Sequence, residues 1–171
     1  IISHVTRMHN RSRGKYKMPI VIRLPYGGGI NALEHHSESM EAMFAHIPGL
    51  KIVVPSTPHD AKGLLISAIE SDDPVLFLEP KRIYRAIKQE VSEEKFSVPI
   101  GKAKVLSQGT DVTVVAYGAM IREVQKAMVM AKEAGYSVEL IDLRTIYPLD
   151  KETIAASVKK TGRLIFVGEE P

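Results

Sequence analysis

The feature that most constrains the fold is a regular alternation of short apolar runs with amphipathic stretches. Runs such as Ile52–Val54 and Val75–Leu78 are rich in β-branched residues or leucine and lack the alternating polar residues of a half-exposed strand. Strands of this kind are buried on both faces, which is typical of parallel sheets covered by helices. We therefore predict an α/β fold. The expected strands span 19–24, 51–54, 75–78, 112–117, 138–143 and 164–167.

The amphipathic stretches between these runs carry helix-start signals. Thr57 followed by Pro58 is typical of a helix N-terminus, and Ser37 or Ser39 is available as the cap of an earlier helix. Asp150 precedes the last helical stretch and can cap it. Strands joined by such helices predict two three-layer α/β/α domains with mainly parallel sheets. The expected helices span 40–47, 57–69, 121–134 and 153–158.

The segment 85–109 departs from this alternation of strands and helices, because it is charged, contains proline and has weak periodicity. Such segments are typical of connections between domains. We therefore assign residues 1–88 to the C-terminal part of a first domain, 89–109 to a linker and 110–171 to the N-terminal part of a second domain. The chain begins at Ile1 without Met and stops just after an expected strand, so we expect a fragment in which both domains are incomplete.

The composition excludes several classes of function. A net charge of +3 among 25% charged residues is too small to indicate a nucleic-acid partner. No apolar run approaches the length of a membrane span, so we expect no membrane partner. Without cysteine there is no disulfide framework and no thiolate metal site. We expect a cytoplasmic protein, or one of the mitochondrial matrix if the source is eukaryotic.

A glycine triplet and two histidines follow the first expected strand. Gly27–Gly29 can adopt positive φ without a Cβ penalty, and ligands of open α/β sheets bind at this carboxyl edge. An imidazole of His35 or His36 could act there as an acid, a base or a hydrogen-bond donor, or merely cap the following helix. Glu34, Glu38 and the two histidines are crowded into one loop, a spacing that disfavours a shared metal ion. Neither a dinucleotide-binding glycine motif nor a Walker-type loop is present.

Four ungapped runs carry a resemblance to a known family. They read P-Y-G-G-G-I-N-A-L-E-H-H-S-E-S from Pro25, F-L-E-P-K-R-I-Y-R from Phe77, I-D-L-R-T-I-Y-P-L-D from Ile141 and K-T-G-R-L-I-F-V-G-E-E-P from Lys160. With them the chain resembles the β subunit of the thiamine-diphosphate-dependent 2-oxo acid dehydrogenase first component over nearly its whole length. The run from Phe77 resembles the branched-chain enzymes more than the pyruvate enzymes of animals, although bacterial pyruvate enzymes share parts of the chain.

The resemblance implies a fold, an activity and partners. The first domain would be of the thiamine-diphosphate pyrimidine-binding type, and the second would be like the transketolase C-terminal domain. The activity would be oxidative decarboxylation of a branched-chain 2-oxo acid, with acyl transfer to the lipoyl group of an acyltransferase component. The β chain would work in an α2β2 heterotetramer, in which thiamine diphosphate and Mg2+ are held mainly by the α subunit.

The same resemblance assigns candidate site residues. His36 matches the family histidine that donates a proton during reductive acylation of the lipoyl group, and His35 is the weaker candidate. The glutamate and the aromatic residue with which the family holds the cofactor would lie upstream of Ile1. We therefore expect no cofactor-binding residue in this chain and no activity from the fragment alone.

The resemblance also implies a structural monovalent cation, K+, in the turn that contains Ala68, Ser71 and Asp73. Backbone carbonyls would supply most ligands, and relatives often have Asn in place of Asp73. An ordinary capped turn accounts for the same residues. Three further functions stay open, because a fold does not dictate function. They are a pyruvate dehydrogenase β subunit, a transketolase-like thiamine enzyme acting on sugar phosphates, and a non-catalytic scaffold subunit.

Overall fold

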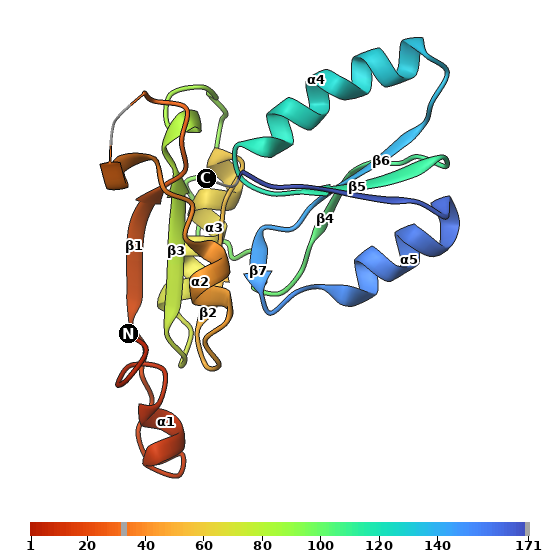
Figure 1. Cartoon of the computed structure of the whole chain (residues 1–171). Coiled ribbons are helices and arrows are strands. Elements are labelled where there is room, and N and C mark those ends of the chain that lie inside the picture. The colour runs from red at the N-terminus through yellow and green to blue at the C-terminus, as the bar shows by residue number, and fades with distance from the viewer. Residues whose placement is uncertain (32–33, 170–171) are drawn as a thin grey trace.

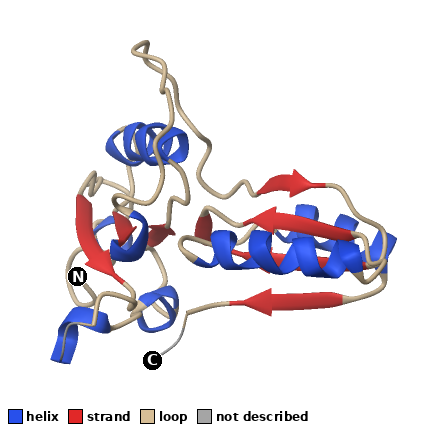
Figure 2. Ribbon diagram, turned by 90° about the horizontal axis from the view of Figure 1, so that it is seen from above, coloured by secondary structure: helices blue, strands red, loops and turns tan. Residues whose placement is uncertain are grey.

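The computed structural model describes residues 1–31 and 34–169 and contains two α/β domains, each built on its own four-stranded sheet (Figures 1 and 2). The first sheet has the strand order β1-β3-β2-β7. Its strands are β1 (Val21–Tyr26), β2 (Lys51–Val53), β3 (Val75–Pro80) and β7 (Thr145–Tyr147). The helices of this part are α1 (Met8–Arg11), α2 (Glu41–Ala45) and α3 (Pro58–Ile69), with 3₁₀ turns η1 (Glu34–Ser37) and η2 (Lys81–Ile83).

The second sheet has the strand order β4-β6-β5-β8 and lies between two helices, α4 and α5, one on each face (Figure 1). Its strands are β4 (Lys104–Ser107), β5 (Val112–Ala116), β6 (Val138–Asp142) and β8 (Leu164–Val167), and the helices are α4 (Met120–Glu133) and α5 (Lys151–Thr161). Most neighbouring strands in both sheets are parallel, and each sheet has one antiparallel pairing at an edge. The predicted α/β class with two layered domains is confirmed.

The first sheet is buried on both faces. Leu64 of α3 packs with Val53 and Phe77 on one face. The opposite face carries Leu76, which belongs to a core shared with Ile141 of the second domain. Because apolar burial is the main driving force of association, this shared core joins the two domains into one packed unit.

Strand β7 was not predicted from the sequence. It follows β6 of the second domain but pairs antiparallel with β2 of the first, with Ile52 opposite Tyr147 and Val53 opposite Thr145. A three-residue strand followed by Pro148 gives no recognisable strand pattern. Strand β4 was missed as well, and it lies inside the segment 89–109 that was expected to be a linker.

The predicted caps are partly confirmed. The Thr57 side chain accepts a hydrogen bond from the Asp60 amide at 3.1 Å, and Asp150 accepts one from the Thr153 amide at 3.2 Å. The expectation that a serine caps the helix near 40–47 is wrong, because Met40 precedes α2 and makes no side-chain cap. Among the described residues, no helix has the length and apolar character needed to cross a bilayer.

Strands β1 and β3 end side by side, with Tyr26 opposite Pro80. Pro25 is tolerated within β1 because β1 is an edge strand, where a missing amide donor can face away from the ladder. The glycine loop therefore leaves the sheet at the shared carboxyl edge of parallel strands, as predicted. This edge is where the candidate functional residues converge.

Candidate functional site

The glycine loop makes a sharp turn directly after β1. Gly27 and Gly29 have φ of +84° and +80°, which is the left-handed region that glycine adopts without strain. The Gly27 amide donates a hydrogen bond to the carbonyl of Glu38 at 2.9 Å, which closes the loop on itself. A Cβ on Gly29 would lie 2.8 Å from Cδ of Arg82, so the loop is also packed closely against the segment after β3.

His36 lies in η1 at this carboxyl edge, and its side chain is exposed. Its backbone carbonyl accepts a hydrogen bond from the ammonium of Lys81, the first residue after β3. The loop that carries the histidine is thereby tied to the neighbouring strand of the same sheet. The side chain of His35, the weaker sequence candidate, lies outside what the structure describes.

The second domain closes over the same edge. Gly118, just after β5, has φ of +55°, and a Cβ there would lie 2.8 Å from Tyr26 Oη, 3.0 Å from Val54 Cγ1 and 3.1 Å from Pro80 Cγ. The carboxyl ends of parallel strands from the two sheets therefore meet. Residues from two domains can act together on a ligand at such a junction.

Three further side-chain contacts join the two domains here. Arg82 Nη2 lies 2.8 Å from Oε1 of Glu123 in α4, and the Gly28 amide donates a hydrogen bond to Oε1 of Glu169 at 2.9 Å. Deeper inside, the phenol of Tyr117 donates a hydrogen bond to Oε1 of Glu41 at 2.7 Å, and both residues are buried. The sequence did not identify these residues as partners, because the members of the three pairs are 41, 141 and 76 positions apart along the chain.

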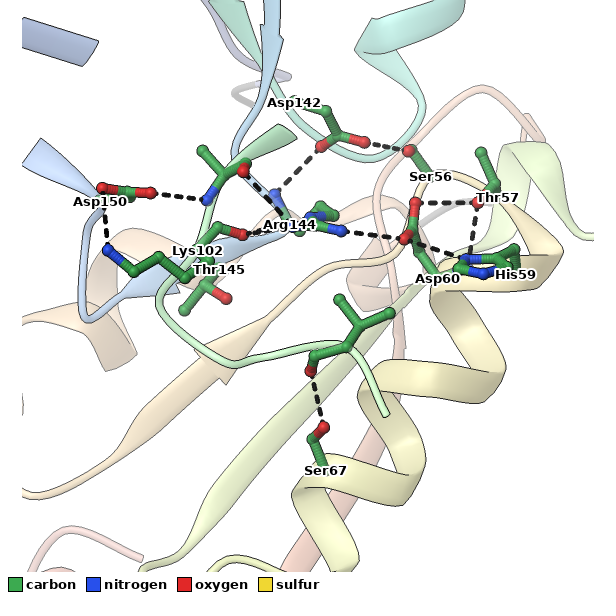
Figure 3. A network of polar contacts seen from close by, with 12 residues as sticks. Ser56, Thr57, His59, Asp60, Ser67, Lys102, Asp142, Arg144, Thr145 and Asp150 are labelled. Carbon is green, nitrogen blue, oxygen red and sulfur yellow. Dashed lines mark hydrogen bonds and ion pairs between the residues drawn. The ribbon is translucent and has the colours of Figure 1, made fainter. Parts of the chain in front are cut away.

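A second polar cluster lies between the domains around Arg144 (Figure 3). Arg144 adopts φ of +55°, and its amide donates a hydrogen bond to Oδ1 of Asp142 at 3.0 Å. Its guanidinium lies 3.3 Å from Oδ1 of Asp60 and donates a hydrogen bond of 2.8 Å to the carbonyl of Lys102. Ser56 donates a hydrogen bond to the other carboxylate oxygen of Asp142.

Burial raises the pKa of Asp142 to about 6, and the nearby Asp60 carboxylate acts in the same direction. The hydrogen bonds from Ser56 and from the Arg144 amide lower the pKa of Asp142, but they offset only part of the increase caused by burial. The cluster is therefore a buried, hydrogen-bonded brace between the domains. Its side chains are buried, whereas His36 is exposed at the sheet edge.

The residues predicted to bind a monovalent cation come together where α3 ends, with Ala68 in its last turn. The Ser71 amide donates a hydrogen bond to the Ala68 carbonyl at 3.3 Å, and Ser71 Oγ donates one to the Asp73 carbonyl at 3.0 Å. The ammonium of Lys51 lies 3.0 Å from Ser71 Oγ and 3.1 Å from Asp73 Oδ2. The turn thus binds positive charge, here from a lysine. Within the described residues, no group of three acidic, histidine or cysteine side chains is arranged to hold a metal ion.

Solved structures with the same arrangement of two α/β domains define the class of the fold. A split-gene transketolase, solved as an inactive β4 tetramer, superposes with a TM-score of 0.74 at 23% identity and covers 96% of this chain and 53% of that one. A transketolase variant from Pichia stipitis superposes with a TM-score of 0.63 at 16% identity, over 89% of this chain and 23% of that one. The fold is therefore the one that transketolases use.

The family follows from the sequence as a whole. Residues 2–87 match the transketolase pyrimidine-binding domain, and residues 101–171 match the transketolase C-terminal domain. The chain belongs to the transketolase pyrimidine-binding domain family. Its second domain matches the transketolase C-terminal domain, so the two domains follow one another in the order that the resemblance implies.

Curated relatives are similar along both domains. Proteins named "Pyruvate dehydrogenase E1 component subunit beta" match at 63% identity in Acholeplasma laidlawii, 52% in Mycoplasma genitalium and 50% in Bacillus subtilis. Each match extends over 169 residues, which is 99% of this chain and 52% of the relative. The chain thus spans about half the length of the curated relatives it matches. These names favour the pyruvate alternative over the branched-chain interpretation.

Proposed function

We propose that this chain is part of the β subunit of a pyruvate dehydrogenase first component. The reaction is the oxidative decarboxylation of pyruvate with transfer of the acetyl group to the lipoyl group of an acyltransferase. The observation that carries this proposal is the 63% identity to a pyruvate dehydrogenase β subunit over both domains. The branched-chain interpretation rested on the overall resemblance and on the short run from Phe77 to Arg85, and the identity measured over 169 residues outweighs it.

The proposed cofactor is thiamine diphosphate, which supplies the carbanion chemistry at the 2-oxo carbon when it is bound. The glycine loop does not fit its diphosphate, and among the described residues no group of three acidic, histidine or cysteine side chains is arranged to hold Mg2+. The Gly28 amide, the type of donor that binds a phosphate oxygen, already donates a hydrogen bond to the Glu169 carboxylate, and a second anion would be repelled there. We therefore assign the diphosphate and Mg2+ to an α subunit, in an α2β2 heterotetramer.

We assign His36 the role of proton donor to the lipoyl dithiolane during acetyl transfer. Its support is its position, because the side chain is exposed at the carboxyl edge of β1 and β3, where a lipoyl group arriving from solution can reach it. The backbone of His36 is held by Lys81, which limits the freedom of the loop. Imidazole titrates near neutral pH, which suits an acid that must be reprotonated in each cycle.

The test of the proposed function is a substrate comparison with the full-length β chain assembled with its α subunit. Dye-coupled decarboxylation is measured with pyruvate and with 3-methyl-2-oxobutanoate, each with and without thiamine diphosphate and Mg2+. We expect pyruvate to be turned over faster by at least about tenfold, and only with cofactor. Faster turnover of the branched substrate would restore the branched-chain interpretation.

The same assay separates the remaining alternatives. A scaffold subunit would give no cofactor-dependent turnover with either 2-oxo acid. A sugar phosphate ketose, offered with an aldose acceptor, serves as the third substrate, and turnover of that pair alone would indicate a transketolase. The likeness to transketolases, at 23% identity or below, reflects the shared fold and does not by itself favour this activity.

A further inference from the structure

The carboxylate of Glu169 lies directly against the first two glycines of the loop that leads to His36. The Gly28 amide donates a hydrogen bond to its Oε1 at 2.9 Å. A Cβ on Gly27 would lie 3.2 Å from Oε2, and a Cβ on Gly28 would lie 3.2 Å from Oε1. The absence of side chains at both glycines thus lets the carboxylate approach the backbone. Glu169 comes from the second domain, two residues after β8, where the chain runs back toward the first sheet (Figure 1).

The glycine and histidine loop has a second set of anchors at the segment after β3. Lys81 donates a hydrogen bond to the carbonyl of His36, and Arg82 packs against Gly29. Arg82 is in turn held by Glu123 of α4 at 2.8 Å. The loop is therefore fixed at its start by Glu169 and near its end by Lys81, and residues of the second domain contribute to both sets of contacts.

We propose that Glu169 is a positioning residue that fixes the glycine loop and through it the place of His36; the catalytic part of this inference rests on the proposed function. A segment with adjacent glycines has more backbone conformations to lose than any other, so it needs an external contact to stay in one of them. A hydrogen bond to a charged carboxylate is stronger than one to a neutral acceptor. Small displacements of a proton donor lower the rate of transfer steeply.

The first test does not depend on catalysis. Amide hydrogen exchange is measured for the segment 27–37 in the full-length protein with its α subunit, comparing wild type with Glu169→Ala. We expect exchange in this segment to be at least about tenfold faster in the variant and unchanged in β5. The matched control is Glu133→Ala, which removes an exposed carboxylate of the same domain. Equal exchange of the segment in wild type and Glu169→Ala would overturn the proposal, whatever the enzyme catalyses.

The second test separates the two half-reactions. In Glu169→Ala we expect acetyl transfer from pyruvate to a lipoyl domain to slow by about 10- to 100-fold, whereas dye-coupled decarboxylation stays within about twofold. Glu169→Gln keeps an oxygen acceptor for the Gly28 amide and should recover most of the transfer rate. An equal loss in both half-reactions, or no recovery in Glu169→Gln, would show a general structural role and contradict positioning.

A third variant covers the case in which the alanine variant does not assemble. Glu169→Met keeps the bulk of the side chain without its acceptor, and the same faster exchange is expected. If wild type fails to turn over pyruvate, the proposed function is wrong, but the exchange comparison still decides whether Glu169 holds the loop.

Discussion

Ser56 donates a hydrogen bond to Oδ2 of Asp142, although 86 positions separate the two residues along the chain. Ser56 follows β2 of the first domain, and Asp142 ends β6 of the second. Both are almost completely buried, with 2% and 0% of their surfaces exposed. This contact is part of the buried polar cluster around Arg144 that joins the two domains.

The raised pKa of Asp142 makes the brace sensitive to pH. Its pKa is about 6 in the folded protein against 3.8 for the free group, mainly because of burial. The folded state therefore holds this proton more tightly, so the contribution to stability is fully present below about pH 3.8 and is lost as pH rises through about 6. Asp142→Asn, which is neutral at every pH, should lack this dependence in the full-length protein.

The measurement is the free energy of unfolding in urea between pH 4 and pH 7 for wild type and Asp142→Asn. The difference between the two isolates Asp142 from the other titrating groups. We expect wild type to lose stability relative to the variant as pH rises through this window. A difference that stays constant with pH would show that Asp142 has an ordinary pKa.

Arg144 forms an ion pair with the buried Asp60, in which Nη1 lies 3.3 Å from Oδ1. Arg144→Met would leave the buried Asp60 and Asp142 carboxylates without this guanidinium, which typically costs about 3–5 kcal/mol of unfolding free energy. Arg144→Lys should cost less, since it keeps the charge but not the bonds to the Lys102 carbonyl.

The matched control for Arg144→Met is Lys17→Met, which breaks an ion pair with Asp72 whose two side chains are 62% and 63% exposed. Exposed pairs contribute little, so we expect a change below about 1 kcal/mol. Denaturant unfolding of the full-length variants checks both values. An equally small effect at Arg144 would mean that the brace contributes no more than a surface pair.

Gly118 of the second domain packs closely against the first. In Gly118→Ala the new Cβ would clash with Tyr26, Val54 and Pro80, and φ of +55° adds backbone strain. We expect a loss of about 2–4 kcal/mol in unfolding free energy, because overpacking and strain add. Gly162→Ala is the control, since Gly162 has φ of +68° with no atom within 4 Å of the new Cβ, and it should cost only about 1 kcal/mol. Similar losses at both positions would rule out close packing at Gly118.

The predicted monovalent cation is tested through Lys51, whose ammonium lies in the same turn as Ser71 and Asp73. In Lys51→Met the turn loses this charge, so K+ should raise the Tm more in the variant than in wild type. The Tm of both proteins is measured in potassium chloride and in choline chloride at equal ionic strength, which removes general screening. Equal Tm values in the two salts for the variant would show that the turn binds no K+ and is an ordinary capped turn.

The alternation of strands and helices was predictable from the sequence because it follows from local pattern. Helix α3 illustrates this, since Thr57, Pro58 and its apolar positions are all close neighbours. Strand β7 was not predictable, because Thr145–Tyr147 becomes a strand only by pairing with β2 some ninety positions away. The same limit applies to the site, where the glycine loop and His36 stand out locally, whereas Glu169 is brought to Gly28 by the fold alone.

The most direct test of the proposed function is single-turnover acetylation of a lipoyl domain by the full-length β chain assembled with its α subunit, with pyruvate as the donor. The comparison is between wild type, His36→Ala and His46→Ala, the last being an exposed histidine elsewhere in the first domain. We predict that wild type and His46→Ala acetylate the lipoyl domain at similar rates and that His36→Ala is slower by about 10²- to 10⁴-fold. A wild-type protein that cannot transfer acetyl groups from pyruvate would contradict the proposed function. His36→Ala that transfers them at the wild-type rate would contradict the role of His36 as proton donor.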